Sequence, residues 1–380
     1  MWRSNALGLD QTAGLPKRDP GRCVCPFTQA VVFLTLGFLT PVLALAADTT
    51  PPTTPVVTDD GTSTTSTTQL HATWTSADPE SGIAESQYLI RQDSTSGTIL
   101  VTWTSTGPTA SVTRTGLSLI QGKRYYFGVK AKNGAGLWSA VGYSNGISVD
   151  TTAPSAPGQP KEGSSTTDYD YDGDGSYTVY WPAASDPDSG VSAYEVQERL
   201  GASGPWTSLT TTRTSPKFSV SGRVDKTQYV YQVRAKNGAG LWSPWSASSD
   251  GILVDKTAPL AVSVTDDGAT TSSITTLHAT WTASSDPESG IMSYEYLIRQ
   301  DSTSGTIIVP YTSVGTATEV TRTGLSLIVG KTYYLGVRAK NGAARYSSIR
   351  YSNGILVQAD TTPPVISFTS PTDGQILVAP

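Results

Sequence analysis

Cysteine is nearly absent from this 380-residue chain, and the two that occur, Cys23 and Cys25, both lie close to the N-terminus. A disulfide framework is therefore excluded, so each domain has to be large enough to hold itself together by core packing. Charged residues are also sparse, at 15%, and the formal net charge is −5. This balance argues against a basic surface that follows phosphates, so no nucleic-acid partner is expected.

Catalytic signatures are missing as well. The sequence contains no nucleophile elbow, phosphate-binding loop, zinc motif or dinucleotide fingerprint. The only histidines, His71 and His278, occupy equivalent positions in two repeats, and each is alone there. Neither histidine can supply a metal cluster or activate a cysteine. We therefore expect the chain not to be an enzyme and to need no cofactor, apart from the calcium considered below.

The composition favours many short strands. Glycine (36) and proline (24) are abundant, as are threonine and serine, and these residues suit turns and strands better than long helices. Tyrosine (18) and tryptophan (9) are frequent enough to seed several small cores, so the chain is not simply a disordered stalk.

The N-terminal segment, residues 1–46, has the layout of a secretory signal. Basic residues precede an apolar run from Ala30 to Ala46, and small residues follow Pro41. Cleavage after Ala46 or Ala47 would release a secreted, extracellular protein that could remain at the cell surface. The run is long enough that an uncleaved anchor is the alternative, and it would be the chain's only membrane contact.

Internal repetition organises the remainder. The phrase Asp-Thr/Lys-Thr-x-Pro begins at Asp48, Asp150, Asp255 and Asp360, at intervals of 102, 105 and 105 residues. Each phrase reads as a short, proline-rich linker, because proline cannot donate to a strand ladder. The predicted modules are 48–150, 151–255 and 256–359, and residues 360–380 begin a further module. Nothing in the repeats indicates an oligomer.

The same landmarks recur in each unit. Leu70, Ala72 and Trp74 alternate with polar residues and are predicted to share the inner face of a strand. An acidic turn follows, and then a tyrosine-bearing strand, with Tyr88, Tyr194 and Tyr294 to Tyr296 as counterparts. A later strand alternates inward before an Asn-Gly turn, and its inward positions in the first unit are Tyr125, Phe127, Val129 and Ala131.

These landmarks resemble the fibronectin type III modules of bacterial secreted and cell-surface proteins. That family places a tryptophan on its second strand, as Trp74, Trp181 and Trp281 do here. It also has a Leu-x-x-Gly-x-x-Tyr corner, which is matched at Leu119 to Tyr125 and at Leu327 to Tyr333, whereas the second unit keeps only Tyr229. The resemblance implies an all-β fold of tandem immunoglobulin-like sandwiches.

The second unit alone carries an aspartate-rich loop, in which Asp168, Asp170, Asp172 and Asp174 alternate with other residues. This is the spacing of calcium ligands in a loop, although the glutamate expected at the twelfth position is missing. We predict a weak structural Ca²⁺ site, with an acidic, solvated turn as the alternative. The repeated Asp-Pro-acid-Ser-Gly turns, such as Asp78 to Gly82, are interpreted as turn chemistry and not as paired catalytic carboxylates.

A Trp-Ser-x-Trp-Ser box at Trp242 to Ser246 resembles the box of cytokine-receptor fibronectin modules, in which tryptophans stack with basic side chains. Arg234 and Lys236 are predicted to face Trp242 and Trp245 in such a stack. The alternative is a platform on which sugars stack.

The functions left open are three. The first is a non-catalytic structural or adhesive array at the cell surface, with a protein or a polysaccharide as partner. The second is an accessory region of a secreted polysaccharide-degrading enzyme. The third is a weak glycan-binding module.

Overall fold

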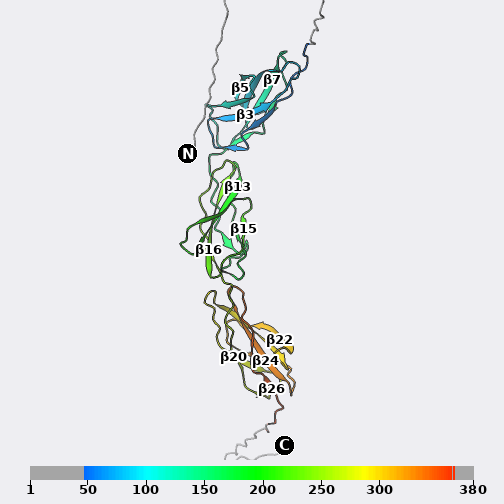
Figure 1. Cartoon of the computed structure of the whole chain (residues 1–380), viewed down its shortest axis with the longest axis vertical. Coiled ribbons are helices and arrows are strands. Elements are labelled where there is room, and N and C mark those ends of the chain that lie inside the picture. Colours follow the sequence, from blue (N-terminus) through cyan, green and yellow to red (C-terminus); the bar gives the residue numbers. More distant parts are fainter. Residues whose placement is uncertain (1–46, 362, 364–380) are drawn as a thin grey trace, which may run out of the picture. The chain divides into compact units, whose positions relative to one another are not determined.

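The computed structural model describes residues 47–361 and 363, and it contains no helix within them. The predicted signal or anchor segment, residues 1–46, lies outside the described residues, as does nearly all of the module predicted to begin at Asp360. No helix in the described part of the chain is long and apolar enough to cross a membrane. The described strands form three groups along the chain (Figure 1), which we call the first, second and third sandwich.

The first sandwich pairs a three-stranded sheet, in the order β1-β3-β6, with a larger sheet in the order β2-β9-β7-β4-β5, to which β8 adds beside β7. All pairings are antiparallel except β2 with β9. Its strands are β1 (Val56–Asp59), β2 (Ser63–Thr64), β3 (Leu70–Thr75), β4 (Ile83–Gln92), β5 (Thr98–Gly107), β6 (Ser111–Arg114), β7 (Arg124–Asn133), β8 (Gly142–Tyr143) and β9 (Ile147–Val149).

The second sandwich repeats this plan with the sheets β10-β12-β15 and β11-β17-β16-β13-β14. Its strands are β10 (Lys161–Glu162), β11 (Tyr171–Asp172), β12 (Tyr177–Tyr180), β13 (Val191–Leu200), β14 (Thr207–Arg213), β15 (Lys217–Val220), β16 (Thr227–Asn237) and β17 (Ile252–Val254).

The third sandwich has the sheets β18-β20-β23 and β19-β26-β24-β21-β22, with β25 beside β24. Its strands are β18 (Val264–Asp266), β19 (Thr270–Thr271), β20 (Leu277–Trp281), β21 (Ile291–Gln300), β22 (Thr306–Ser313), β23 (Glu319–Arg322), β24 (Thr332–Asn341), β25 (Arg350–Tyr351) and β26 (Ile355–Val357). The all-β fold class that the sequence predicted is confirmed.

Period-two patterning explains where each core lies. On β3, Leu70, Ala72 and Trp74 are buried, while the residues between them are not, as the alternation predicted. The four predicted inward residues of β7, from Tyr125 to Ala131, are fully buried. Each sandwich has its own cluster of buried apolar side chains, which is what allows cysteine-free modules of this size to be stable.

The register corrects one predicted correspondence. Tyr88 faces Val129 across the sheet, whereas Tyr194 faces Ala235, the counterpart of Ala131. Tyr194 is therefore displaced by two residues from the position of Tyr88, on the same face of the sheet. It packs edge-on against Trp181, with 5.5 Å between the ring centroids. A two-residue shift preserves the inward direction, so alternation alone could not detect it.

Candidate functional site

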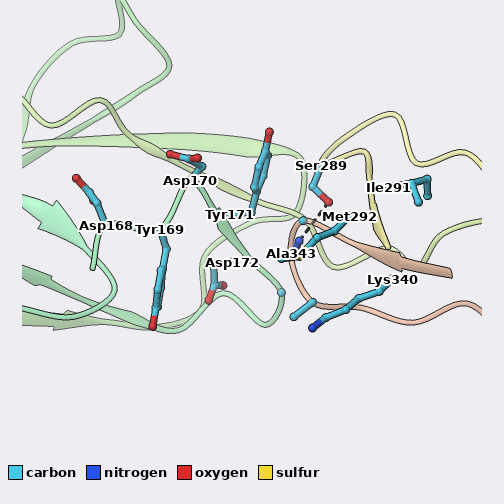
Figure 2. A pocket seen from close by; sticks show the side chains of 13 residues that line it. Asp168, Tyr169, Asp170, Tyr171, Asp172, Ser289, Ile291, Met292, Lys340 and Ala343 are labelled. Atoms are coloured by element: carbon cyan, nitrogen blue, oxygen red, sulfur yellow. Dashed lines mark hydrogen bonds between the residues drawn. The ribbon is translucent and has the colours of Figure 1, made fainter. Parts of the chain in front are cut away.

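The aspartate-rich segment follows β10 and includes β11 in the second sandwich, and its four aspartates do not converge on one point. Figure 2 shows the side chains of Asp168, Asp170 and Asp172 leaving the chain at separate places. Asp172 accepts hydrogen bonds from the backbone N–H groups of Asp174 (3.2 Å) and Gly175. Asp174 in turn accepts one from Ser176 (2.8 Å). These two aspartates hold a turn, which is ordinary aspartate chemistry.

Asp168 has different neighbours. Its Oδ1 accepts the backbone N–H of Glu162 at 2.9 Å. One carboxylate oxygen from each of Asp168, Glu162 and Asp250 lies within 4.8 Å of the other two. Of the four predicted calcium ligands, only Asp168 belongs to a group of carboxylates close enough to share a cation. Glu162 and Asp250 were not singled out from the sequence, and they lie 88 residues apart in it.

A shallow hollow lies beside the loop (Figure 2). Tyr169 and Tyr171 contribute to its lining, together with third-sandwich residues that include Met292 and Lys340. It is largely open, and of the three grouped carboxylates only Asp168 lines it, whereas Glu162 and Asp250 do not. We assign it no role.

The tryptophan box forms a sandwich around one cation. The Arg234 guanidinium carbon lies 4.6 Å from the ring centre of Trp242 and also 4.6 Å from that of Trp245. Its Nε and Nη2 donate to Glu195 Oε2 at 2.8 and 2.6 Å, and Glu195 is buried. Lys236 Nζ approaches Trp242 from 5.5 Å. The cation is thus held by rings on two sides and by a carboxylate, which limits its freedom to contact a ligand.

The other two sandwiches have the same device with different residues. In the first, Lys130 Nζ lies 4.6 Å from the ring of Trp103 and 4.3 Å from that of Trp138. In the third, the guanidinium carbon of Arg338 lies 3.7 Å from the ring centre of Tyr311 and 3.9 Å from that of Tyr346. Sequence analysis missed Trp103 and Tyr311, because they lie on the edge strands β5 and β22, two strands away in the sheet from the cations and far along the chain from the box.

The acidic turns are held by backbone donors. Asp78 Oδ1 accepts the N–H of Ser81 at 2.8 Å, and Asp186 and Asp286 do the same with Ser189 and Ser289. The Ser81 N–H lowers the pKa of Asp78 more than any other influence does, and burial only partly opposes this. A carboxyl kept ionised in this way is unsuited to be a general acid, which has to be protonated before it acts.

Each acidic turn also joins a three-part contact that the sequence did not reveal. The Asn237 side-chain amide donates to Asp150 Oδ2 (2.8 Å), to Asp186 Oδ2 (3.2 Å) and to the carbonyl of Thr152 (2.8 Å). Asn133 and Asn341 make the same contacts in the first and third sandwich. The repeated Asp-Thr phrase, acidic turn and Asn-Gly turn therefore meet at one place in each sandwich. We call this contact the Asp-Asn lock.

Comparison with known proteins gives a consistent set of relatives. The chain is 31% identical to chitinase A1 of Niallia circulans over 242 residues, which cover 60% of this chain and 30% of that protein. It is 36% identical to endoglucanase B of Cellulomonas fimi over 184 residues (45% and 16%). It is 30% identical to exoglucanase B of the same species over 220 residues (56% and 18%). The chain thus spans less than a third of the length of these relatives.

No family model matches the chain. Among solved structures, the three fibronectin domains FN1-FN3 of chicken CNTN1 align with 82% of this chain and with all of that chain. The identity is 19% and the TM-score is 0.35.

Proposed function

We propose that this chain, a tandem array of fibronectin type III sandwiches, is a non-catalytic accessory region of an extracellular polysaccharide-degrading enzyme, in which it spaces other parts of the protein. The observation that carries this proposal is the set of relatives. Three proteins named for chitin or glucan hydrolysis match the chain over 184 to 242 residues. Segments of that length cover about two of the repeats, so the likeness extends beyond one module to the array.

The geometry supports a spacing role. Among the described residues, the stacked cations and the turn carboxylates make contacts within their own sandwich and stabilise its fold. The cations of the aromatic stacks are enclosed by rings, and the turn carboxylates accept backbone hydrogen bonds. Linkers this short also suit a spacer, since Asp150 follows the last strand of the first sandwich directly and already takes part in the lock of the second.

A glycan-binding role is the second candidate, and one observation favours it. The rings that enclose the cations are not fully buried: Trp103 is 38% exposed and Tyr311 is 43% exposed. Half-exposed rings on a sheet face can stack on sugars. A structural or adhesive array at the cell surface, with a protein partner, is the third candidate.

Assays with insoluble chitin and cellulose separate these roles. For a spacer we expect the purified array to release no sugar and to stay in the supernatant. Retention that is lost in Trp103→Ala and Tyr311→Ala, or in Trp245→Ala, with the fold intact, would instead establish glycan binding. Hydrolysis that co-purifies with the array through several columns would overturn the proposal.

A positive test replaces the linker of a reporter chitinase, between its catalytic and its chitin-binding domain, with residues 48–360. We expect faster hydrolysis of insoluble chitin than with a short flexible linker, and an unchanged rate on soluble oligosaccharide. An equal rate on both substrates for the two linkers would argue against spacing.

A further inference from the structure

Three carboxylates of the second sandwich come together from separate parts of the fold. Glu162 is the last residue of β10, in the three-stranded sheet, whereas Asp250 lies two residues before β17, in the five-stranded sheet. Asp168 lies on the loop that leaves β10. One oxygen from each carboxylate lies within 4.8 Å of the other two. The group therefore lies between the end of β10 in one sheet and the segment that leads into β17 in the other.

A tight hairpin places Asp168 there. Ser164 donates its N–H to the carbonyl of Thr167 at 3.0 Å, and Tyr169 donates to the carbonyl of Glu162 at 2.8 Å. The chain turns at Gly163, whose φ of +116° is one that residues with a side chain rarely adopt. The Glu162 N–H then bonds Asp168 Oδ1, which fixes the second carboxylate beside the first.

Glu162 is the unusual member of the group. Its side chain is fully buried, and neither of its carboxylate oxygens has a hydrogen-bond partner. None of the ion pairs between described residues includes Glu162, Asp168 or Asp250. A buried carboxylate next to two others is unfavourable unless a positive charge or a proton compensates it. Asp168 and Asp250 are exposed, so the group is open to solvent on one side.

The other sandwiches show how the same position is satisfied without a cation. Asp59 and Asp266 occupy the register of Glu162, facing Ala72 and Ala279 where Glu162 faces Val179. Asp59 accepts the N–H of Gly146 at 3.1 Å, and Asp266 accepts that of Gly354 at 3.2 Å.

The residue before that glycine also differs. It is Asn145 in the first sandwich and Asn353 in the third, but Asp250 in the second. Where its siblings have a hydrogen-bonded aspartate, the second sandwich has Glu162, whose carboxylate is unsatisfied. Where they have a neutral asparagine, it has a second carboxylate, that of Asp250. The hairpin then adds Asp168 as a third.

Burial raises the pKa of the Glu162 carboxyl to about 8. The negative charges of Asp168 and Asp250 raise this pKa further, and the nearby Ser249 hydroxyl lowers it, although it forms no hydrogen bond with the Glu162 carboxylate. A bound proton is therefore the competitor of a bound cation at this group.

We propose that Glu162, Asp168 and Asp250 bind a hard divalent cation, of which Ca²⁺ suits the group best. Carboxylate oxygens are the preferred ligands of Ca²⁺, which tolerates an irregular ligand set completed by water and carbonyl oxygens, whereas Mg²⁺ demands near-ideal octahedral geometry. This set differs from the aspartate loop predicted from the sequence, with which it shares only Asp168. A cation here links β10 to the segment that leads into β17, so it stabilises the second sandwich.

Hydrogen exchange of the array, with and without Ca²⁺, tests the site. Extracellular calcium modules bind with a Kd of about 10⁻⁴ to 10⁻³ M, so about 5 mM Ca²⁺ is suitable. At ten times Kd, we expect exchange to slow about tenfold in peptides that cover Glu162 to Asp170 and Ser248 to Val254. The peptides of the first and third sandwich that contain Asp59 and Asp266 should not respond, and they serve as internal controls. NaCl at matched ionic strength controls for screening.

Three variants decide the donor set. Glu162→Gln keeps the shape of the side chain, and Asp250→Asn installs the residue of the sibling sandwiches. Each should weaken Ca²⁺ binding, measured by calorimetry, by at least about tenfold. Asp170→Asn, in the same loop but outside the group, should bind normally. Loss of binding in Asp170→Asn alone would overturn this donor set in favour of the aspartate loop.

If Glu162 binds a proton and the group binds no cation, we expect different results. In that case neither heat nor protection appears at about 5 mM Ca²⁺ near pH 7.5, and Glu162→Gln stabilises the second sandwich whether or not Ca²⁺ is present. That result would also overturn the proposal. Equal protection by NaCl would do so too, because it would show screening without a site.

Discussion

The side-chain amide of Asn237 donates to the carboxylate of Asp150 across 2.8 Å, although 87 residues separate the two in sequence. Both residues are almost completely buried, and the same pairing recurs in the first and third sandwich. The phrase that opens each repeat is therefore bonded to the turn near its end, so each module is closed on itself by side chains as well as by strands.

Replacing Asn237 with alanine should destabilise the second sandwich. The change leaves the buried Asp150 carboxylate without one of its donors, and such a loss costs about 1–3 kcal/mol. Native-state hydrogen exchange can assign the loss to one sandwich, and the first and third sandwich should be unchanged. Asn133→Ala should give the same loss in the first sandwich, and unaltered exchange in both variants would contradict the lock.

Acid should weaken the same locks. Burial by itself raises the pKa of Asp150, but hydrogen bonds from Ser189, Thr152 and Gln121 outweigh it and lower the pKa below 3.8. Because the folded pKa lies below the unfolded value, the stabilisation is present above pH 3.8 and is lost as the pH falls through the folded pKa. The pKa of Asp255 is lowered in a similar way.

We therefore expect the free energy of unfolding of the second sandwich to fall more steeply below pH 4 in the natural chain than in Asp150→Asn. Parallel pH profiles of the two proteins would show that Asp150 contributes nothing to acid sensitivity.

The tyrosine corner is complete in the second sandwich despite its altered sequence. The hydroxyl of Tyr229 accepts the N–H of Val224 at 3.0 Å, just as Tyr125 accepts that of Ile120 at 2.9 Å. Tyr229→Phe should lower the free energy of unfolding by about 1 kcal/mol, the value of one such hydrogen bond. Tyr125→Phe is the matched control and should cost slightly more, since its hydroxyl also contacts Gln92. An unchanged free energy of unfolding in Tyr229→Phe would mean that the corner hydrogen bond does not stabilise the second sandwich.

The aromatic stack of the second sandwich should be structural. We expect Trp245→Ala to lower the melting temperature through a loss of about 1–2 kcal/mol, since one of the two rings on Arg234 is removed. Arg234→Ala should cost more, because it leaves Glu195 buried without its ion-pair partner.

Arg234→Lys is the matched control for the stack, since the first sandwich has Lys130 at this position. Its melting temperature should lie between those of Trp245→Ala and Arg234→Ala. A melting temperature that Trp245→Ala leaves unchanged, together with lost polysaccharide retention, would favour the glycan platform instead.

Much of the fold could be predicted from local pattern. Alternation placed Trp74 and Tyr125 inside, and recurrence at fixed intervals gave the repeat, because both signals depend on residues close in sequence. The partner of a side chain on another strand depends on strand order and register, which alternation does not encode. Trp103, which encloses Lys130 together with Trp138, was missed for that reason.

The candidate cation site shows the same limit. The aspartate loop attracts notice because its carboxylates are adjacent in sequence, yet two of them are used in a turn. The residues that approach Asp168 are a glutamate in a strand of two residues and an aspartate near the end of the module. Only the closure of the two sheets brings them together.

Asp150 belongs to two modules at once. Its backbone N–H bonds the carbonyl of Thr64 in the first sandwich, while its side chain completes the lock of the second. A boundary between 150 and 151 therefore cuts off a residue that the second module needs. Whole repeats copied from one such aspartate to the next keep every junction intact, so unequal recombination can lengthen or shorten the gene without new compensating mutations. The first and third repeats share the run Ile-Arg-Gln-Asp-Ser-Thr-Ser-Gly, at Ile90 to Gly97 and at Ile298 to Gly305, which is what such copying would leave behind.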